Sequence, residues 1–410
     1  MASPGARLTG RLGSAVFLAG FGYAALARLG VLLPALRATP GHDGDHPAPG
    51  RLSVTFLVPA REEHLDVGRA VGSMLACRHD DVQVLAVVDT GDQRTVAAAE
   101  GAEDGSGRLR VVRDASIGGK GAALIAALPL VDGAVVGVFD ADSVVHPDLL
   151  APVAAAFAAG ADVVQVPVRP RWGRTGGWHG ARTLLDYAAW SRGRAGTTTG
   201  VVRLSGTGVF FRTELLRAVG GWRPSLTEDF DLALRLTGIG ARVTVVDRPE
   251  IATDEQAPRS AHSLLRQRVR WHQGFLEILT AGTWRRLPTA PMRAAALGPL
   301  LVPVGRALAA TAAVLVAAAV LAGAPAPGAV VVVPAAALAV LVSTIDAAVF
   351  ARLAPAYGVR PSAGRLAGLV LGAVPFYAVS AAASVLAVGR QLAGRHTWET
   401  TAHGATKYSG

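Results

Sequence analysis

Four long apolar segments constrain the fold of this chain more than any other feature. They cover Leu12–Leu36, Leu300–Leu321, Ala329–Ala351 and Leu366–Gly389, and each is close to the ~20 residues that cross the hydrocarbon core of a bilayer. Each segment alone is compatible with a buried core helix, but the four flank a single region of ordinary polarity. The sequence therefore predicts membrane helices on both sides of one polar domain.

The first segment is predicted to be an uncleaved anchor. Its run from Leu12 to Leu36 is interrupted only by Arg28, and it is longer than the roughly 7–15-residue core of a secretory signal peptide. No Ala-x-Ala cleavage site followed by an exported domain is evident. We therefore expect this end of the chain to remain attached to a membrane.

The composition argues against two large classes of protein. Hydrophobic residues make up 51% of the 410 residues and charged residues only 17%, which excludes a disordered regulator and disfavours an ordinary soluble enzyme. The one cysteine, Cys77, cannot form an internal disulfide, so nothing indicates an oxidising compartment. The net charge of +10 is almost all arginine. We attribute it to arginines near the bilayer and to a few that meet phosphate, and we expect no nucleic-acid partner.

The charges near the last two segments leave the membrane topology open. The arginines between the third and fourth segments are Arg352, Arg360 and Arg365. The positive-inside rule places this connection in the cytoplasm, and with it the central domain, two crossings away. Four full crossings would nevertheless put Arg390, Arg395 and Lys407 outside. Either the tail breaks the rule, or one segment lies in the interface or re-enters the membrane.

Residues 51 to 255 alternate between predicted strands and helices. The apolar runs typical of strands are Val54–Val58, Val82–Val88, Leu109–Val112 and Ala134–Phe139, and helical patterns cover Glu62–Ala76 and Gly121–Leu128. This alternation predicts an α/β fold with a mainly parallel sheet covered on both faces. Ligands of such sheets bind beyond the carboxyl ends of the strands. Acidic residues follow three of the runs, namely Glu62 and Glu63, Asp89, and Asp140 with Asp142.

The segment Asp140-Ala141-Asp142 is a candidate metal site. Its two carboxylates lie two positions apart just past a predicted buried strand, and carboxylates held together normally need a cation to stay ionised. Mg²⁺ or Mn²⁺ bound in this way takes its remaining ligands from water and substrate phosphates. Asp-x-Asp is also a common turn sequence, so the motif alone leaves both readings open.

Two further motifs lie on predicted helices. Thr227-Glu228-Asp229 opens one helix, and an N-capping Thr227 followed by acids in the first turn would explain it without any chemistry. Gln267 to Trp271 lies in a later amphipathic helix. An arginine beside an indole there can contact a phosphate and a sugar face, or the helix can simply lie on lipid.

Taken in order, these motifs resemble the family 2 glycosyltransferases, in particular the membrane-integrated branch that contains cellulose, chitin, hyaluronan and poly-N-acetylglucosamine synthases. The resemblance covers residues 51 to 280. It is carried by Val58-Pro59-Ala60-Arg61-Glu62-Glu63, Asp89, Gly118-Gly119-Lys120-Gly121, Asp140-Ala141-Asp142, Gly206-Thr207-Gly208, Thr227-Glu228-Asp229 and Gln267 to Trp271. It implies a single Rossmann-like catalytic domain of the GT-A type with flanking transmembrane helices.

The resemblance also implies a role for each motif. The donor-binding residues would be Pro59, Arg61, Glu62, Asp89, Lys120, Asp140, Gln267, Arg270 and Trp271. Asp140 and Asp142 would hold Mg²⁺ or Mn²⁺ on the diphosphate. The acceptor side would consist of Gly206, Thr207, Gly208, Glu228 and again Trp271. Asp229 would be the general base for one direct displacement, which inverts the anomeric carbon and makes a β-linked product from an α-linked donor.

The expected activity is therefore transfer of a sugar from a UDP-sugar to a glycan or lipid-linked acceptor at the cytoplasmic membrane face, in polysaccharide or cell-envelope glycan synthesis.

Two features depart from the pattern of this family. Asp89-Thr90-Gly91-Asp92 stands where many relatives have Asp-Asp or Asp-Gly-Ser. Four membrane segments also form little wall for a secretion pore, which favours a short product, a lipid-linked acceptor, or a homo-oligomer or export partner.

Three alternatives remain open at this point. The first is single addition to a polyprenyl phosphate or glycerolipid, which product length would separate from processive synthesis. The second is a nucleotidyltransferase, which would not need Asp229 beside an Arg-Trp helix. The third is a non-catalytic transporter or scaffold with a degenerate domain, which the complete set of carboxylates disfavours.

The predicted organisation has five regions. These are an anchor and linker at 1–50, the catalytic domain at 51–258, an amphipathic interfacial region at 259–295, transmembrane segments at 296–390 and a tail at 391–410.

Overall fold

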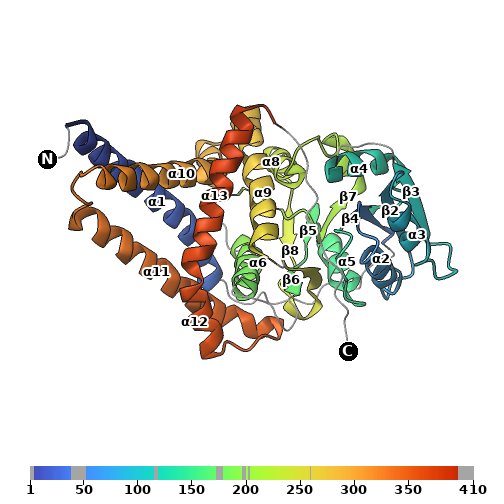
Figure 1. Ribbon diagram of the computed structural model, residues 1–410. Helices are drawn as coiled ribbons and strands as arrows, with labels where there is room; N and C mark the ends of the chain where they lie inside the picture. The colour runs from blue at the N-terminus through green and yellow to red at the C-terminus, as the bar shows by residue number, and fades with distance from the viewer. Residues whose placement is uncertain are drawn as a thin grey trace.

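The computed structural model describes residues 4–37, 52–114, 119–171, 179–195, 200–201, 204–258 and 260–395. An α/β domain forms one side of the molecule, and long helices from both ends of the sequence form the other (Figure 1). Gly118 and Lys407 lie outside the described residues.

The central sheet has seven strands in the order β3-β2-β1-β4-β7-β5-β8. The strands are β1 (Val54–Ala60), β2 (Val82–Asp89), β3 (Leu109–Asp114), β4 (Val135–Val138), β5 (Val163–Gln165), β7 (Val209–Arg212) and β8 (Val243–Val245). All pairings are parallel except those of β7, which runs antiparallel to β4 and β5. A separate parallel pair joins β6 (Val168–Arg171) to β9 (Thr253–Gln256). The predicted, mainly parallel α/β sheet is therefore confirmed.

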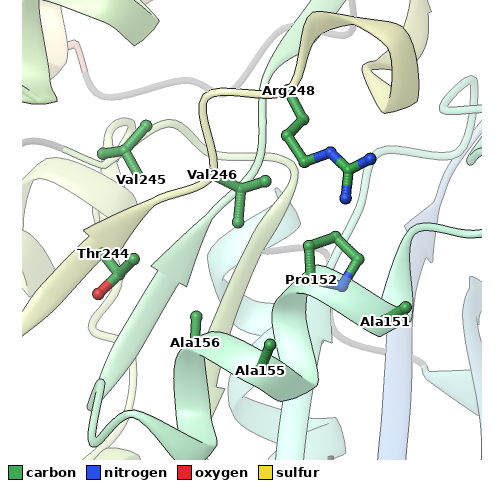
Figure 2. Close-up of a pocket in the computed structure, with 8 residues that line it drawn as sticks. All are labelled: Ala151, Pro152, Ala155, Ala156, Thr244, Val245, Val246 and Arg248. Atoms are coloured by element: carbon green, nitrogen blue, oxygen red, sulfur yellow. The ribbon is translucent and has the colours of Figure 1, made fainter. Parts of the chain in front are cut away.

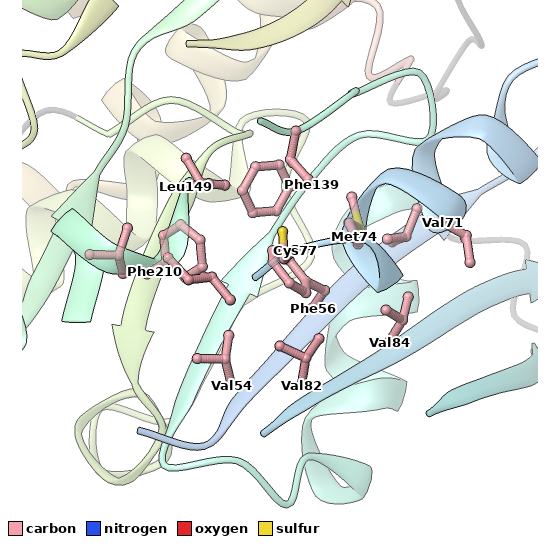
Figure 3. Close-up of a cluster of buried hydrophobic side chains, with 14 of the residues drawn as sticks. Val54, Phe56, Val71, Met74, Cys77, Val82, Val84, Phe139, Leu149 and Phe210 are labelled. Atoms are coloured by element: carbon pink, nitrogen blue, oxygen red, sulfur yellow. The ribbon is translucent and has the colours of Figure 1, made fainter. Parts of the chain in front are cut away.

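Helices cover both faces of this sheet. The helices of the domain are α2 (Val67–Leu75), α3 (Gln93–Glu100), α4 (Gly119–Ala127), α5 (Leu150–Ala158), α6 (Gly180–Ala195), α7 (Thr213–Ala218), α8 (Glu228–Gly238) and α9 (Ala261–Ala281). Side chains of α2, α3 and α5 share one apolar core, and those of α4, α7 and α8 share the other. Figure 3 shows the first core, in which the rings of Phe56, Phe139 and Phe210 meet edge to face at 5.4–6.0 Å.

One predicted helix starts later than expected. The pattern suggested Glu62–Ala76, but α2 begins at Val67. Glu62 has a φ of 59°, which lies in the left-handed region that residues other than glycine rarely adopt. Its backbone N–H donates to Asp92 Oδ2 at 2.6 Å. The chain therefore turns sharply after β1 before the helix can form.

Four helices are long and apolar enough to cross a membrane by length and composition. The predicted segments correspond to α1 (Pro4–Arg37), α10 (Ala290–Leu321), α11 (Ala329–Leu353) and, for the fourth, a pair of helices. The prediction of one continuous fourth segment was wrong: α12 (Ala363–Leu371) ends at Leu371 with Gly372 as its C-cap, and a separate helix, α13 (Ala373–Leu392), begins at Ala373. Pro375 explains the break, since it lacks the N–H that would bond to the carbonyl of Leu371.

A buried ionic cluster attaches the long apolar helices α1 and α11 to the domain. Asp346 of α11 accepts hydrogen bonds from Arg28 of α1, at 2.8 and 3.0 Å, and from Arg182 of α6. Arg28 also pairs with Asp186 of α6 at 2.6 Å. Removing one partner of a buried ion pair costs about 3–5 kcal/mol. The cluster therefore fixes where α1 and α11 sit on α6.

Candidate active site

A cavity of about 430 Å³ lies at the carboxyl ends of β1, β2 and β4. Its walls at the sheet include Pro59, Arg61, Glu63, Asp89, Lys120, Asp140, Asp142, Glu228, Asp229 and Glu255. Its opposite wall comes from α9, through Gln267, Arg268, Arg270, Trp271 and Phe275. The cavity also reaches the long apolar helix α1 at Arg28 and Val31. Acidic side chains and an apolar helix of membrane-spanning length therefore line one continuous space.

Lys120 is the cation at the centre of this space. Its Nζ donates to Asp140 Oδ1 and, at 2.6 Å, to the carbonyl oxygen of Gly206. Burial opposes the charge of the ammonium group. The negative charges of Asp140, Glu228 and Asp229 outweigh that effect and raise the pKa of Lys120. The side chain is therefore a stable positive charge among three carboxylates.

A buried hydrogen-bond chain extends from Asp142 to β9. Asp142 Oδ2 accepts the backbone N–H of Gln256 at 2.9 Å, and the neighbouring Glu255 Oε1 accepts from Ser143 Oγ at 3.0 Å. The hydroxyl groups of Ser143 and Thr207 lie 3.1 Å apart. The second carboxylate of the Asp-x-Asp motif is thus held in place by the strand that precedes α9.

This region carries more negative charge than its cations balance. Burial, together with the charges of Asp142, Asp66 and Asp140, raises the pKa of Glu63 to about 9. Burial and the charges of Asp140 and Asp142 also raise the pKa of Glu255 well above its usual range. Such mutual repulsion is what a bound cation relieves.

The donor set fits a hard divalent ion that shares its coordination with a substrate. Asp140 and Asp142 offer the oxygen ligands that Mg²⁺ and Mn²⁺ prefer. Within the described ranges, no group of three or more His, Cys, Asp or Glu side chains is arranged to hold a metal. An ion at the two aspartates would therefore take its other ligands from water and phosphate oxygens.

Asp229 and Glu228 open α8 beside Lys120. Burial raises the pKa of Asp229 above its ordinary value, and Lys120 opposes this shift. Burial raises the pKa of Glu228 to about 7, again against the charge of Lys120. Asp229 Oδ1 accepts the N–H of Phe230 at 2.8 Å, while Thr227 makes no capping hydrogen bond through its side chain. Helix capping alone therefore does not explain this motif.

Gln165 positions the glycine-containing loop across from Asp229. Its Nε2 donates to the carbonyl oxygens of Thr207 and Gly208 at 3.0 and 2.7 Å, and its Oε1 accepts from Ser205 N at 3.0 Å. A Cβ at Gly206 would lie 3.4 Å from Lys120 Nζ and 3.5 Å from Asp229 Oδ2. Any larger residue at 206 would extend into the space between them.

Helix α9 closes the cavity and also holds the Thr-Glu-Asp loop. Glu277 Oε2 accepts the N–H of Leu226 at 3.1 Å. The guanidinium carbon of Arg268 lies 4.8 Å from the centre of the Trp271 ring. Gly274 packs against Thr227 so closely that a Cβ there would lie 2.5 Å from Thr227 Oγ1. The helix and the loop therefore form one unit.

Gly274→Ala is expected to lower turnover by about tenfold to a hundredfold, because the added methyl group must push α9 away from the Asp229 loop. Overpacking of this kind also costs about 1–3 kcal/mol of stability. Gly72→Ala on α2 is the matched control, since a Cβ there meets nothing within 4 Å. Steady-state kinetics and thermal unfolding of both variants test this. If Gly274→Ala had the turnover and the thermal stability of the wild type, the close packing of Gly274 against Thr227 would not be what positions the Asp229 loop.

A smaller hollow of about 200 Å³ lies between α5 and β8 (Figure 2). Its walls are Ala151, Pro152, Ala155, Ala156, Thr244, Val245, Val246 and Arg248. Arg248 is its one charged residue, and its guanidinium donates to Glu250 at 2.8 Å. The catalytic and metal-binding candidates Asp229, Asp140 and Asp142 line the larger cavity instead.

The family model for "Glycosyltransferase like family 2" matches residues 49–274, which is more than half of the chain. The chain belongs to this family. This membership confirms the family resemblance that the order of the motifs carries.

Two curated relatives carry the same name. The beta-monoglucosyldiacylglycerol synthase of Synechocystis sp. is 32% identical over 251 residues, covering 58% of this chain and 51% of the relative. The beta-monoglucosyldiacylglycerol synthase of Trichormus variabilis is 28% identical over 228 residues, covering 54% and 48%. The chain thus spans about half the length of the curated relatives it matches.

A solved structure supports the fold over nearly the whole chain. The mannosyltransferase PcManGT from Pyrobaculum calidifontis, solved in complex with GDP-Man and Mn²⁺, aligns with a TM-score of 0.64 and 21% identity. The alignment covers 95% of this chain and 100% of that one. The fold is therefore of the GT-A type with associated apolar helices, as predicted.

Most of the residues that the sequence singled out in this family member line one cavity. Those in its wall are Pro59, Arg61, Asp89, Lys120, Asp140, Asp142, Gly206, Thr207, Glu228, Asp229, Gln267, Arg270 and Trp271. Glu62 and Gly208 are not in the wall. Glu62 is exposed and Glu63 faces the cavity instead, while the carbonyl of Gly208 is bonded to Gln165 and Val166.

Four residues that line or support the cavity were not expected from the sequence. Glu255, Tyr187 and Asp186 line the cavity, and Gln165 supports it through its bonds to the loop around Gly206. None belongs to a recognisable motif. Arg28 was not expected in the site either; in the sequence it stands out only as the lone charge of an apolar segment, and such residues usually face a partner or a site.

Proposed function

We propose that this chain is an inverting, metal-dependent glycosyltransferase that adds one sugar from a nucleotide-sugar donor to the hydroxyl group of a membrane glycerolipid, at the cytoplasmic face. The observation that carries the proposal is the shape of the cavity. It runs from the carboxylates at the sheet to Arg28 and Val31 on the membrane helix α1. A lipid acceptor can reach Asp229 from that end without leaving the bilayer.

The donor would bind at the sheet end. Asp89, whose Oδ1 accepts the N–H of Gly91 at 2.9 Å and whose Oδ2 lies 3.5 Å from Arg61 Nε, forms the corner proposed for the nucleoside. Lys120 and Arg270 would face the diphosphate. Asp140 and Asp142 would hold Mg²⁺ or Mn²⁺, which when bound supplies positive charge to the leaving diphosphate.

Asp229 would take the proton from the acceptor hydroxyl as its oxygen attacks the anomeric carbon. The bond to the diphosphate breaks in the same displacement, so an α-linked donor gives a β-linked product. A base is most effective when its pKa approaches the working pH, and burial shifts the pKa of Asp229 in that direction. Lys120, as a fixed positive charge, would stabilise both the carboxylate and the departing diphosphate.

The names of these curated relatives support a glycerolipid acceptor, because each is called a beta-monoglucosyldiacylglycerol synthase. Processive synthesis of a glycan is the second candidate. It is favoured by Trp271, whose indole lines the cavity and offers a surface on which a sugar ring can stack.

Product length separates these two functions. Full-length protein in lipid nanodiscs would be supplied with diacylglycerol, Mn²⁺ and a radiolabelled donor, first UDP-glucose and then GDP-mannose. We expect one sugar per lipid with one of these donors. A ladder of products would instead establish the processive function, and donor hydrolysis without any glycosylated product would contradict both.

A further inference from the structure

Helix α13 differs in its packing from the other helices that are long enough to cross a membrane. It lies beside α9 and α10. Figure 1 shows α1, α10 and α11 extending away from the α/β domain, whereas α13 stands beside α9 at a steep angle to them. Its 20 residues measure about 30 Å, which would span the hydrocarbon core only if the helix stood nearly upright in it.

Three contacts attach α13 to α9 from its first turn to just beyond its end. The guanidinium carbon of Arg268 lies 5.2 Å from the centre of the Phe376 ring. His272 Nδ1 and Ser384 Oγ are 3.0 Å apart, and Gln273 Nε2 donates to the carbonyl oxygen of Arg395. Because Ser384 Oγ already donates to Ser380 O at 2.9 Å, it accepts the N–H of a neutral His272.

Helix α9 cannot follow α13 into the hydrocarbon. It carries Arg266, Arg268, Arg270 and Glu277 along its length. Placing an arginine at the centre of a membrane costs roughly 2.5–3.5 kcal/mol even on the most lenient scale. The contacts of α13 with α9 run from its first turn to just beyond its end, so the position of α9 limits the position of α13 along its whole length.

The two sides of α13 suit the surface of a bilayer. One side, which includes Phe376, Ser380, Ala383, Ser384 and Ala387, is buried against the protein. The other exposes apolar side chains, with Val374 76%, Leu386 47% and Leu392 84% exposed. A helix with one packed side and one exposed apolar side can lie in the interface with the apolar side toward the acyl chains.

We propose that α13 lies along the cytoplasmic surface of the membrane beside α9, so that the described part of the chain crosses three times, through α1, α10 and α11. The distribution of charge agrees. From the last turn of α11 onward, the lysines and arginines among the described residues are Arg352, Arg360, Arg365, Arg390 and Arg395, and all would then be cytoplasmic. The connection from Ala322 to Gly328 on the far side carries no charge. Arg7 and Arg11, near the start of α1, would lie on the far side, where they are fewer than the five cytoplasmic arginines.

This arrangement also fixes the depth, relative to the bilayer, of the end of the cavity that reaches α1. Arg268 and Trp271 of α9 line the cavity with Arg28 of α1. With α9 and α13 at the surface of the bilayer, that end opens at the level of the lipid head groups. The topology itself stands whichever acceptor the enzyme uses.

Labelling of single-cysteine variants tests this topology directly. Cys77, the one native cysteine, is buried, so Cys77→Ser provides a background. Three exposed positions are then replaced separately: Ala326→Cys between α10 and α11, Ala363→Cys at the start of α12, and Ala393→Cys after α13. A membrane-impermeant maleimide is applied to spheroplasts that contain the full-length chain, before and after permeabilisation.

We expect Ala326→Cys to be labelled in intact spheroplasts, and Ala363→Cys and Ala393→Cys only after permeabilisation. Labelling of Ala393→Cys together with Ala326→Cys in intact spheroplasts would show that α13 crosses the membrane, and would overturn the proposal. Labelling of Ala363→Cys and Ala393→Cys without Ala326→Cys would overturn the cytoplasmic assignment. Because no activity is measured, these results are independent of the acceptor experiments.

Discussion

Asp229→Asn is expected to lower the transfer rate by ~10²–10⁴-fold, the usual contribution of a general base, while donor affinity stays within about twofold. Asparagine keeps the shape of the side chain and can still accept the N–H of Phe230, which Asp229 Oδ1 accepts at 2.8 Å. Lys120 keeps its bond to Asp140. Turnover by product formation and donor affinity by calorimetry would be measured on the same preparation.

Asp231→Asn is the matched control, two positions further along α8. Asp231 is buried and structural: its carboxylate accepts from Thr283 at 3.0 Å and from Arg235 at 2.9 Å. This variant should lose stability but retain turnover. Glu228→Gln should cost less turnover than Asp229→Asn. The opposite order would assign the base to Glu228, and near-normal turnover of Asp229→Asn would remove Asp229 from the role.

Asp142→Ala is expected to abolish the part of donor affinity that depends on metal, a loss of at least about tenfold. The wild-type enzyme should bind the nucleoside diphosphate more tightly with Mn²⁺ than with EDTA, and the variant should bind it equally weakly in both. The physical reason is that Asp142 lies among several carboxylates, where burial together with the charges of Asp142 and Asp140 raises the pKa of Glu63 and Glu255.

Asp254→Ala serves as the control for this second variant. It removes a carboxylate from the same strand region, where Asp254 pairs with Arg169 at 2.5 Å and is absent from the cavity wall. It should keep the dependence on Mn²⁺. If Asp142→Ala binds the donor as tightly as the wild type under both conditions, the two aspartates are not the metal site.

The sheet and most of the cavity could be predicted from the sequence because local signals carry them. The strand runs alternate with helical patterns, and carboxylates that follow parallel strands necessarily meet at one edge. Lys120 was noticeable as one of only two lysines. Its pairing with Asp140 and Gly206 was not predictable, since it depends on the loop around Gly206 that leads into β7, the strand that pairs with β4.

Tertiary contacts explain what the sequence did not reveal. Glu255 reaches Ser143 only because β9 pairs with β6 beside the Asp-x-Asp turn. The lone charges Arg28 and Asp346 were visible within apolar segments, but the identity of their partners depends on where α6 lies. Hydropathy also cannot distinguish a helix that crosses a bilayer from one that lies on it, and for α13 the difference is in its packing against α9.

The most direct test of the central claim is the structure of the product formed by the full-length enzyme in nanodiscs with diacylglycerol and its preferred nucleotide sugar. Mass spectrometry and the anomeric proton coupling in NMR would define it. We expect one β-linked sugar on the free hydroxyl of the lipid. An α-linked sugar would contradict a single displacement that inverts the anomeric carbon with Asp229 as the base. A sugar found only on soluble acceptors would contradict entry of the acceptor from the membrane.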